Sequence, residues 1–197
     1  MRDSQAGFIF RGRPRMSDGH DFVRDFGPKA PHNQPNLEVH MIGRVLRFVR
    51  LPMLLLLIFA VARFLLGANG VPYAPRGNAM FSIVGLTFVS SFYFGALSRR
   101  LGGFGWGGTA LVGYSIGLFA QVLIFVATWL SFAAGIETSY FRHWDALNVP
   151  EGTVVPMATA LQTRLGGLLF GPVFAIVPAL VGRVLSALAP DPGTPTR

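Results

Sequence analysis

Four long apolar segments, separated by short polar stretches, constrain this chain more than any other feature of its sequence. They cover residues 48–67, 79–97, 108–135 and 165–185. About 20 residues of α-helix cross a hydrocarbon core about 30 Å thick, and each segment is of that order of length. Because lipid offers no hydrogen-bond partners, a spanning backbone must satisfy its own polar groups, as a helix does. The sequence therefore predicts an all-α integral membrane protein with four transmembrane helices.

The last two segments are not expected to form straight helices perpendicular to the membrane. Residues 108–135 exceed the length of a perpendicular span, so we expect this helix to tilt or to protrude. The last segment contains Pro172 and Pro178, and a proline removes one helical hydrogen bond. We expect a short outer helix over residues 157–164, followed by a helix that is kinked at its prolines.

The composition supports a membrane protein over a soluble or disordered chain. Apolar residues make up 51% of the sequence and charged residues 13%, whereas a soluble domain carries roughly 25% charged residues. The chain has no cysteine, which excludes a disulfide framework, a thiolate metal site and a cysteine nucleophile.

Polar segments flank the predicted membrane domain, which covers residues 41–189. Residues 1–40 are rich in charge and proline, and we expect them to form a mostly irregular cytoplasmic arm. The arm carries three closely spaced arginines, Arg11, Arg13 and Arg15. In a membrane protein such a cluster favours anionic lipid or a partner subunit over nucleic acid. Residues 190–197 are expected to form a polar cytoplasmic tail.

Arginines recur every three residues where the arm meets the first apolar segment. They are Arg44, Arg47 and Arg50, and they alternate with apolar side chains. This spacing keeps the three charges on one broad side of a helix. The pattern predicts a basic amphipathic helix at the membrane interface, where the arginines contact lipid head groups or a partner.

The distribution of basic residues predicts the orientation of the chain. With the N-terminus cytoplasmic, thirteen of the seventeen basic residues fall on the cytoplasmic side and four on the other. The positive-inside rule then places both termini in the cytoplasm. Sixteen of the seventeen are arginine, which favours a bacterial inner membrane as the location.

Small residues on the last two segments predict where helices pack. One ladder at four-residue spacing comprises Gly105, Thr109, Gly113, Gly117 and Gln121, and a second glycine pair comprises Gly167 and Gly171. Small residues let two helix backbones approach closely, so we expect these two helices to pack along the glycines. Gln121 should face a helix or an aqueous cavity, because its amide has no partners in lipid. Three arginines near segment ends, Arg63, Arg164 and Arg183, are expected to snorkel to the head groups.

The loop at residues 136–153 holds the most mixed chemistry outside the arm. It contains Glu137, Tyr140, Arg142, His143, Trp144 and Asp145. A histidine beside acids and an arginine can perform acid–base catalysis. The favoured interpretation is an interfacial loop with Tyr140 and Trp144 at head-group level, since nothing in the spacing fixes a catalytic geometry. No histidine lies within an apolar segment, so no cofactor is predicted, whereas bound lipids are expected.

These features leave three functional hypotheses open. The favoured one is a non-catalytic accessory or scaffold subunit of a larger membrane complex, which packs through glycine-rich helix faces and holds other subunits with its arm. The first alternative is a small oligomeric transporter, channel or lipid-handling protein, motivated by the prolines of the last segment. The second alternative is a membrane enzyme with its site in the loop at residues 136–153.

Overall fold

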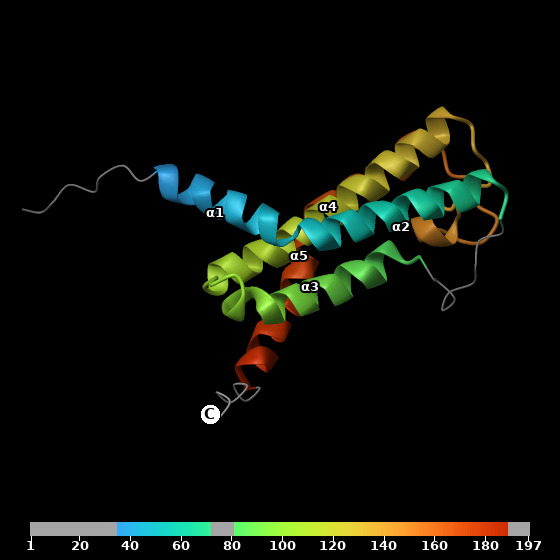
Figure 1. Ribbon diagram of the computed structural model, residues 1–197. Coiled ribbons are helices and arrows are strands. Elements are labelled where there is room, and N and C mark those ends of the chain that lie inside the picture. The colour runs from blue at the N-terminus through green and yellow to red at the C-terminus, as the bar shows by residue number, and fades with distance from the viewer. Residues whose placement is uncertain (1–34, 72–80, 189–197) are drawn as a thin grey trace, which may run out of the picture. The chain divides into compact units, whose positions relative to one another are not determined.

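The computed structural model describes residues 35–71 and 81–188, and every long element in those ranges is a helix (Figure 1). The elements are α1 Pro35–Phe48, α2 Arg50–Ala68, α3 Ile83–Arg100, α4 Trp106–Ala133, the short 3₁₀-helix η1 Asp145–Leu147, and α5 Met157–Leu188. No strand occurs in either range, which confirms the all-helical part of the prediction.

Three helices, α2, α4 and α5, are long and apolar enough to cross a membrane. The remaining long helix, α3, covers only part of the predicted segment 79–97 and continues to Arg100. Its 18 residues include the buried serines Ser90, Ser91 and Ser98 and end in two arginines. These polar residues explain why α3 is less apolar than the other three.

Two boundaries differ from the sequence-based expectation. Residues 35–40, expected in the irregular arm, belong to α1. Proline suits the first turn of a helix, where its missing N–H has no partner to lose. The arm residues Arg11, Arg13 and Arg15 lie outside the described residues.

The expected division of the last segment is wrong, because α5 is one continuous helix that contains both prolines. Pro172 is buried against α4, where an added Cβ at Gly117 would lie 2.9 Å from its Cα atom. A glycine of α4 thus lets α5 pack closely at the position where Pro172 removes a helical hydrogen bond.

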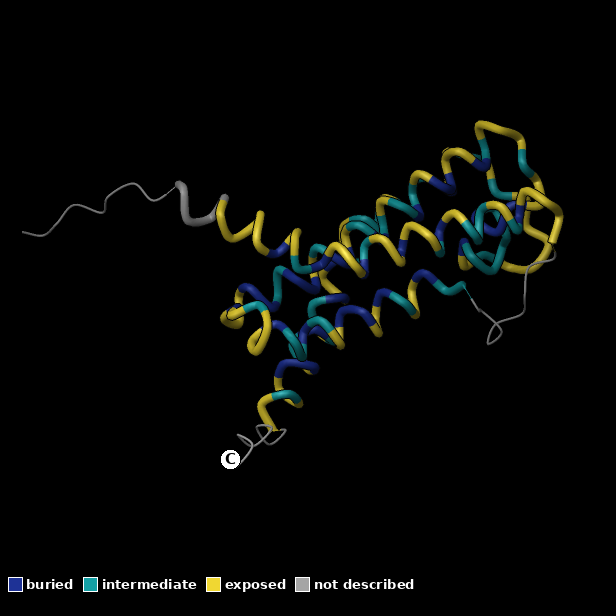
Figure 2. The backbone as a smooth tube through the Cα atoms, in the orientation of Figure 1, coloured by how far each residue is buried: buried dark blue, intermediate teal, exposed yellow. Residues whose placement is uncertain are grey.

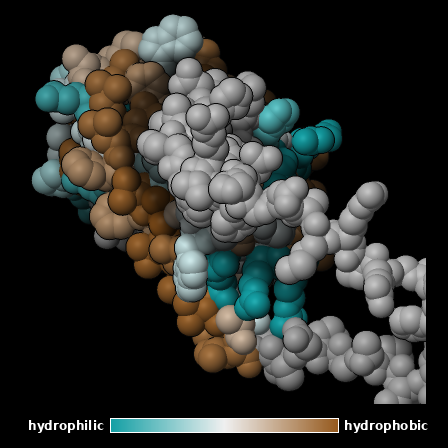
Figure 3. Space-filling view, turned by 90° about the vertical axis from the view of Figure 1, so that its left-hand side faces the viewer, coloured by the Kyte–Doolittle hydropathy of each residue, from teal (hydrophilic) through white to brown (hydrophobic). Residues whose placement is uncertain are grey.

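Helix α5 packs against both α3 and α4, and its interface with α4 is the most extensive of the bundle (Figure 1). Buried positions alternate with exposed positions along α2, α3, α4 and α5, whereas α1 is mostly exposed (Figure 2). Fully buried positions hold mainly small or polar side chains, whereas many Leu, Val and Phe side chains are exposed. Apolar side chains form a broad band on the surface (Figure 3). Such an exterior fits contact with lipid tails.

Candidate functional site

Helices α4 and α5 meet along a ladder of small residues with one antiparallel register. An added Cβ at Gly113 would lie 2.6 Å from the Ala175 carbonyl oxygen and 2.8 Å from Ala179 Cβ. An added Cβ at Gly117 would lie 2.6 Å from Ala175 Cβ. Any larger side chain would therefore push the two backbones apart. The small residues recur every four positions on both helices, so each step along α4 meets one step back along α5.

The ladder continues to Gln121, whose side chain lies over two glycines of α5. An added Cβ at Gly167 would lie 2.8 Å from Gln121 Oε1, and one at Gly171 would overlap the same amide. Six of the seven residues singled out as packing residues meet in this interface, since Thr109 also contacts α5 through Arg183. Gly105 does not, because it precedes α4 as its N-cap and an added Cβ there would meet nothing.

A second close approach joins α3 to α5. An added Cβ at Gly95 would overlap the backbone of Ala179, and one at Gly182 would overlap the Phe92 carbonyl oxygen. The same face of α5 thus has neighbours at backbone distance on two sides. Arg183 follows Gly182 in the sequence, and its side chain reaches Thr109 of α4, which is bonded to Ser98 of α3.

Arg183 is buried and does not snorkel, so the sequence-based expectation for this residue is wrong. Its Nη1 group donates hydrogen bonds to Thr109 Oγ1 at 2.6 Å and to the Phe104 carbonyl at 2.7 Å. The guanidinium carbon lies 4.7 Å from the centroid of the Trp106 ring. The side chain is 9% exposed. These acceptors on α4 and the loop before it lie within reach only because the neighbouring glycine and alanine of α5 let the helices approach.

Thr109, which the sequence marks only as a small packing residue, links three helices. Its hydroxyl receives the bond from Arg183 of α5 and shares a 2.7 Å hydrogen bond with Ser98 Oγ of α3. Both hydroxyl-bearing residues are fully buried. We name Arg183, Thr109, Ser98, Phe104 and Trp106 the arginine cluster.

Other arginines surround the arginine cluster. Arg44 Nη2 donates to the Gly102 carbonyl at 2.9 Å, and its guanidinium lies 5.4 Å from the Phe104 ring centroid. Arg100 Nη2 donates to the Ser186 carbonyl at 3.3 Å. Within residues 40–71 and 81–188, the acids are Glu137, Asp145 and Glu151, all in the loop between α4 and α5, and none pairs with Arg183. Among residues 40–71 and 81–188, the charges at this end of the bundle are therefore all positive.

A second arginine–threonine contact lies at the opposite end of the same interface. Arg164 Nε of α5 donates to Thr128 Oγ1 of α4 at 3.2 Å. Arg164 and Arg183 are nineteen positions apart, as are Thr109 and Thr128. At 1.5 Å per residue, nineteen positions of helix span about 28 Å, which is close to the thickness of a hydrocarbon core.

The loop between α4 and α5 is held mainly by its own backbone and by α2. Thr138 Oγ1 donates to the Gly67 carbonyl at 2.6 Å, and the Arg142 guanidinium lies 4.5 Å from the Phe132 ring centroid. Tyr140 is buried and stacks beneath Arg63, at 5.5 Å from ring centroid to guanidinium carbon. Tyr140 therefore packs against other parts of the protein, and its expected position at head-group level stays a prediction.

His143 takes part in the fold of this loop. Its Nδ1 atom accepts a hydrogen bond from the Asp145 backbone N–H at 3.2 Å, at the start of η1. Burial lowers the pKa of His143 below its ordinary value of 6.5, and Arg63 lowers it further, against the raising effect of Asp145 and Glu151. The neutral ring is thus favoured in the folded loop. Glu137 is exposed, whereas Trp144 is partly buried and lies beside the His143 ring.

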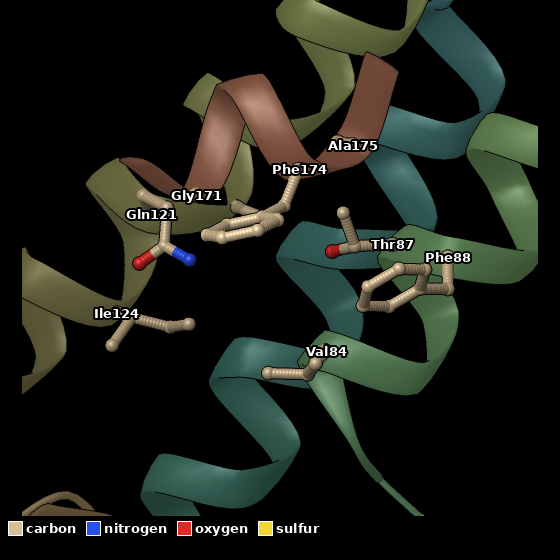
Figure 4. Close-up of a pocket in the computed structure, with 9 residues that line it drawn as sticks. Val84, Thr87, Phe88, Gln121, Ile124, Gly171, Phe174 and Ala175 are labelled. Atoms are coloured by element: carbon tan, nitrogen blue, oxygen red, sulfur yellow. The ribbon is translucent and has the colours of Figure 1, made fainter. Parts of the chain in front are cut away.

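A crevice opens between α3, α4 and α5 beside Gln121 (Figure 4). Its volume is about 180 Å³, and its lining is mostly apolar. Gln121 reaches it from α4, Thr87 from α3 and Phe174 from α5 (Figure 4). Thr87 Oγ1 donates to its own helix. Among the described residues, no hydrogen bond satisfies the Gln121 amide.

Sequence reasoning missed the arginine cluster and the crevice. The four-residue ladder pointed to Thr109 but not to its partner on α5. The signal that was available is the same four-residue spacing on α5, which runs from Gly171 through Ala175 and Ala179 to Arg183. In an antiparallel pair, that spacing brings Arg183 opposite Thr109.

No family model, curated protein or solved structure matches this chain.

Proposed function

We propose that this chain is a four-span membrane protein, with α3 as the fourth crossing, that acts as a non-catalytic accessory subunit of a larger membrane complex. The observation that carries the proposal is the crevice at Gln121. A partner helix that places a polar side chain in the crevice would satisfy the amide, which lipid cannot do.

The size and position of the crevice favour a partner side chain over a solute. Its volume of about 180 Å³ is smaller than the roughly 300–1,000 Å³ of a small-molecule pocket. Its rim is formed by Val84, Phe88 and Phe174, which are 53%, 47% and 64% exposed. A crevice with an apolar, outward-facing rim suits the side of another helix, which covers the rim while one side chain enters.

The proposed topology places both termini in the cytoplasm of a bacterial inner membrane. Arg99 and Arg100 end α3, and Arg183 lies near the end of α5, so all three fall on one side under this topology. The positive-inside rule assigns that side to the cytoplasm. The basic arm would then hold partner subunits there, with Arg11, Arg13 and Arg15 in contact with them or with anionic lipid.

Extraction of the native complex in a mild detergent tests the accessory role. We expect larger subunits to copurify in fixed stoichiometry. The substitution Gln121→Leu should release them, because it removes the proposed hydrogen bond between the Gln121 amide and the partner's side chain. The matched control is Gln162→Leu, at an exposed glutamine of α5 outside the crevice, which should retain the partners.

A chain that purifies alone or only with itself would contradict the accessory role. Helical content and thermal unfolding of both variants establish that they fold. The transporter and lipid-handling alternatives would then be examined by solute flux in liposomes and by analysis of lipid retained at the crevice.

A further inference from the structure

We infer that the arginine cluster binds the phosphate of an anionic phospholipid, held between Arg183 and the backbone N–H groups that begin α4. The inference rests on the membrane location in the proposed function, but it does not depend on the partner subunit. Its support comes from the hydrogen-bonding capacity of Arg183, the open start of α4 and the lack of an acid beside Arg183 among residues 40–71 and 81–188.

Arg183 has hydrogen-bond donors left over. A guanidinium carries five N–H donors, and the two hydrogen bonds to Thr109 and Phe104 both involve Nη1. Among the described residues, Nε and Nη2 have no partner. Nε and Nη2 are also not fully enclosed. Among the described residues, the side-chain polar atom that is both fully enclosed and without a hydrogen-bond partner is Ser91 Oγ. Nε and Nη2 form one edge of the guanidinium, which can bind two oxygens of a phosphate side by side.

The start of α4 adds a second set of donors close to the Arg183 guanidinium. The N-cap Gly105 supplies no side-chain hydrogen bond, so the N–H groups of the first turn, from Trp106 to Gly108, have no capping partner. Added Cβ atoms at Gly105 and Gly107 would meet nothing within 4 Å. The side of this turn is therefore open, and its N–H groups lie at the positive end of a 28-residue helix, where a negative charge is stabilised. The Trp106 ring under Arg183 fixes the guanidinium next to this turn.

The arginines at this end of the bundle would be stabilised by a bound anion. Arg44 and Arg99 lie around the arginine cluster, whereas the acids of residues 40–71 and 81–188 lie in the loop at the other end of α4. A buried guanidinium without a counter-ion is costly in a medium of low dielectric constant. A phosphate would supply both the charge and the two missing acceptors.

The depth of Arg183 favours a lipid phosphate over a free one. The two arginines of α5 that contact threonines of α4 are separated by about 28 Å along the helix, which matches the hydrocarbon core. If Arg164 lies at one interface, Arg183 lies at the other, where phospholipid phosphates are located. The proposed cytoplasmic side is also the side that attracts basic clusters to anionic lipid.

Native mass spectrometry of the purified full chain tests the inference. The protein is reconstituted in nanodiscs of phosphatidylcholine with or without phosphatidylglycerol, released into detergent, and analysed for retained lipid. We expect retention of phosphatidylglycerol in preference to phosphatidylcholine. Arg183→Lys should weaken retention about tenfold, because a lysine keeps the charge but not the paired donors. The control Arg164→Lys should retain the lipid as the wild type does.

A second variant separates loss of lipid from loss of folding. Gly107→Glu adds a carboxylate in open space at the first turn of α4, where a negative charge stabilises a helix. This variant should unfold at the same temperature as the wild type or higher, yet lose the lipid, because its own carboxylate competes with the phosphate. Full retention of phosphatidylglycerol by Gly107→Glu or by Arg183→Lys would overturn the inference.

Inorganic phosphate distinguishes the two sources of the ligand. We expect millimolar phosphate to leave the retained lipid in place. Displacement of the lipid by free phosphate would overturn the assignment to a head group. Extraction of the chain without detergent would contradict the membrane location itself, whereas a detergent-dependent chain that retains no phosphatidylglycerol would contradict only this inference.

Discussion

At both ends of the α4–α5 interface, an arginine of α5 donates a hydrogen bond to a threonine of α4. At one end Arg183 is 9% exposed and bonds to Thr109 and to a backbone carbonyl. At the other end Arg164 is partly buried and bonds to Thr128 through one longer contact of 3.2 Å. The residue types and the spacing are the same, but the surroundings differ.

The difference comes from what packs beside each arginine. Next to Arg183, Gly182 brings the backbone of α3 into contact with α5, and Ser98 of α3 joins the hydrogen-bond network. Next to Arg164, Gly166 has open space where a Cβ would lie. A third helix at backbone distance thus turns a partly exposed contact into a buried one. The position of the glycine, more than the arginine itself, therefore decides at which end the arginine is buried.

The largest expected effect contrasts alanine substitutions at the two glycines of α5. Gly182→Ala should destabilise the chain by about 3 kcal/mol, because its Cβ would overlap the backbone of α3. Gly166→Ala should stabilise it by about 0.5–1 kcal/mol, because open space receives the methyl group and alanine favours a helix. Thermal or denaturant unfolding of the purified chain in detergent measures both. Equal effects at the two positions would remove the contrast between the ends.

A smaller effect is expected from replacing each threonine with valine, which keeps the shape and removes the hydroxyl. Thr109→Val should cost about 2 kcal/mol, since it removes a hydrogen bond to a buried charge and the link to Ser98. Thr128→Val should cost about 1 kcal/mol or less, since its arginine is more exposed. The same unfolding assay applies, and a double substitution should give the sum of the two costs because the sites are far apart.

The smallest effect is a pH dependence confined to the end that carries the loop between α4 and α5. His143 has a lowered pKa, so the folded loop disfavours the proton, and protonation of Nδ1 would break its bond from Asp145 N–H. The contribution of His143 to stability is therefore present above its ordinary pKa of 6.5 and is lost as the pH falls below that value.

Hydrogen exchange at pH 7.5 and pH 5.5, corrected for the intrinsic exchange rate, measures this change. Residues 139–149 should exchange faster at the lower pH, while Gly102–Gly108 at the arginine cluster should not change. His143→Ala should remove the pH dependence without loss of assembly. Equal acceleration at both ends would show that His143 is not its source.

Much of the fold could be predicted from the sequence. Helices α2 to α5 cover most of the apolar segments, and the four-residue ladder from Thr109 to Gln121 identified the face of α4 that packs on α5. Helix ends were less predictable. Helix α1 includes residues 35–40, which the sequence assigns to the arm, and α5 continues through both of its prolines. Local composition favours or disfavours a helix, but packing on a glycine can hold a helix together across a proline.

The order of the residues is enough to predict a helical chain, the places of its apolar segments and the residues of α4 that are small enough for close packing. Those properties depend on local spacing and side-chain size, which can be read directly from the sequence. Only the tertiary structure decided that Arg183 turns inward. An arginine near the end of an apolar segment has two ways to satisfy its charge, at the surface or against buried acceptors. The choice depends on acceptors that lie far away in the sequence, and only the register of α5 against α3 and α4 brings Thr109 and the Phe104 carbonyl within reach.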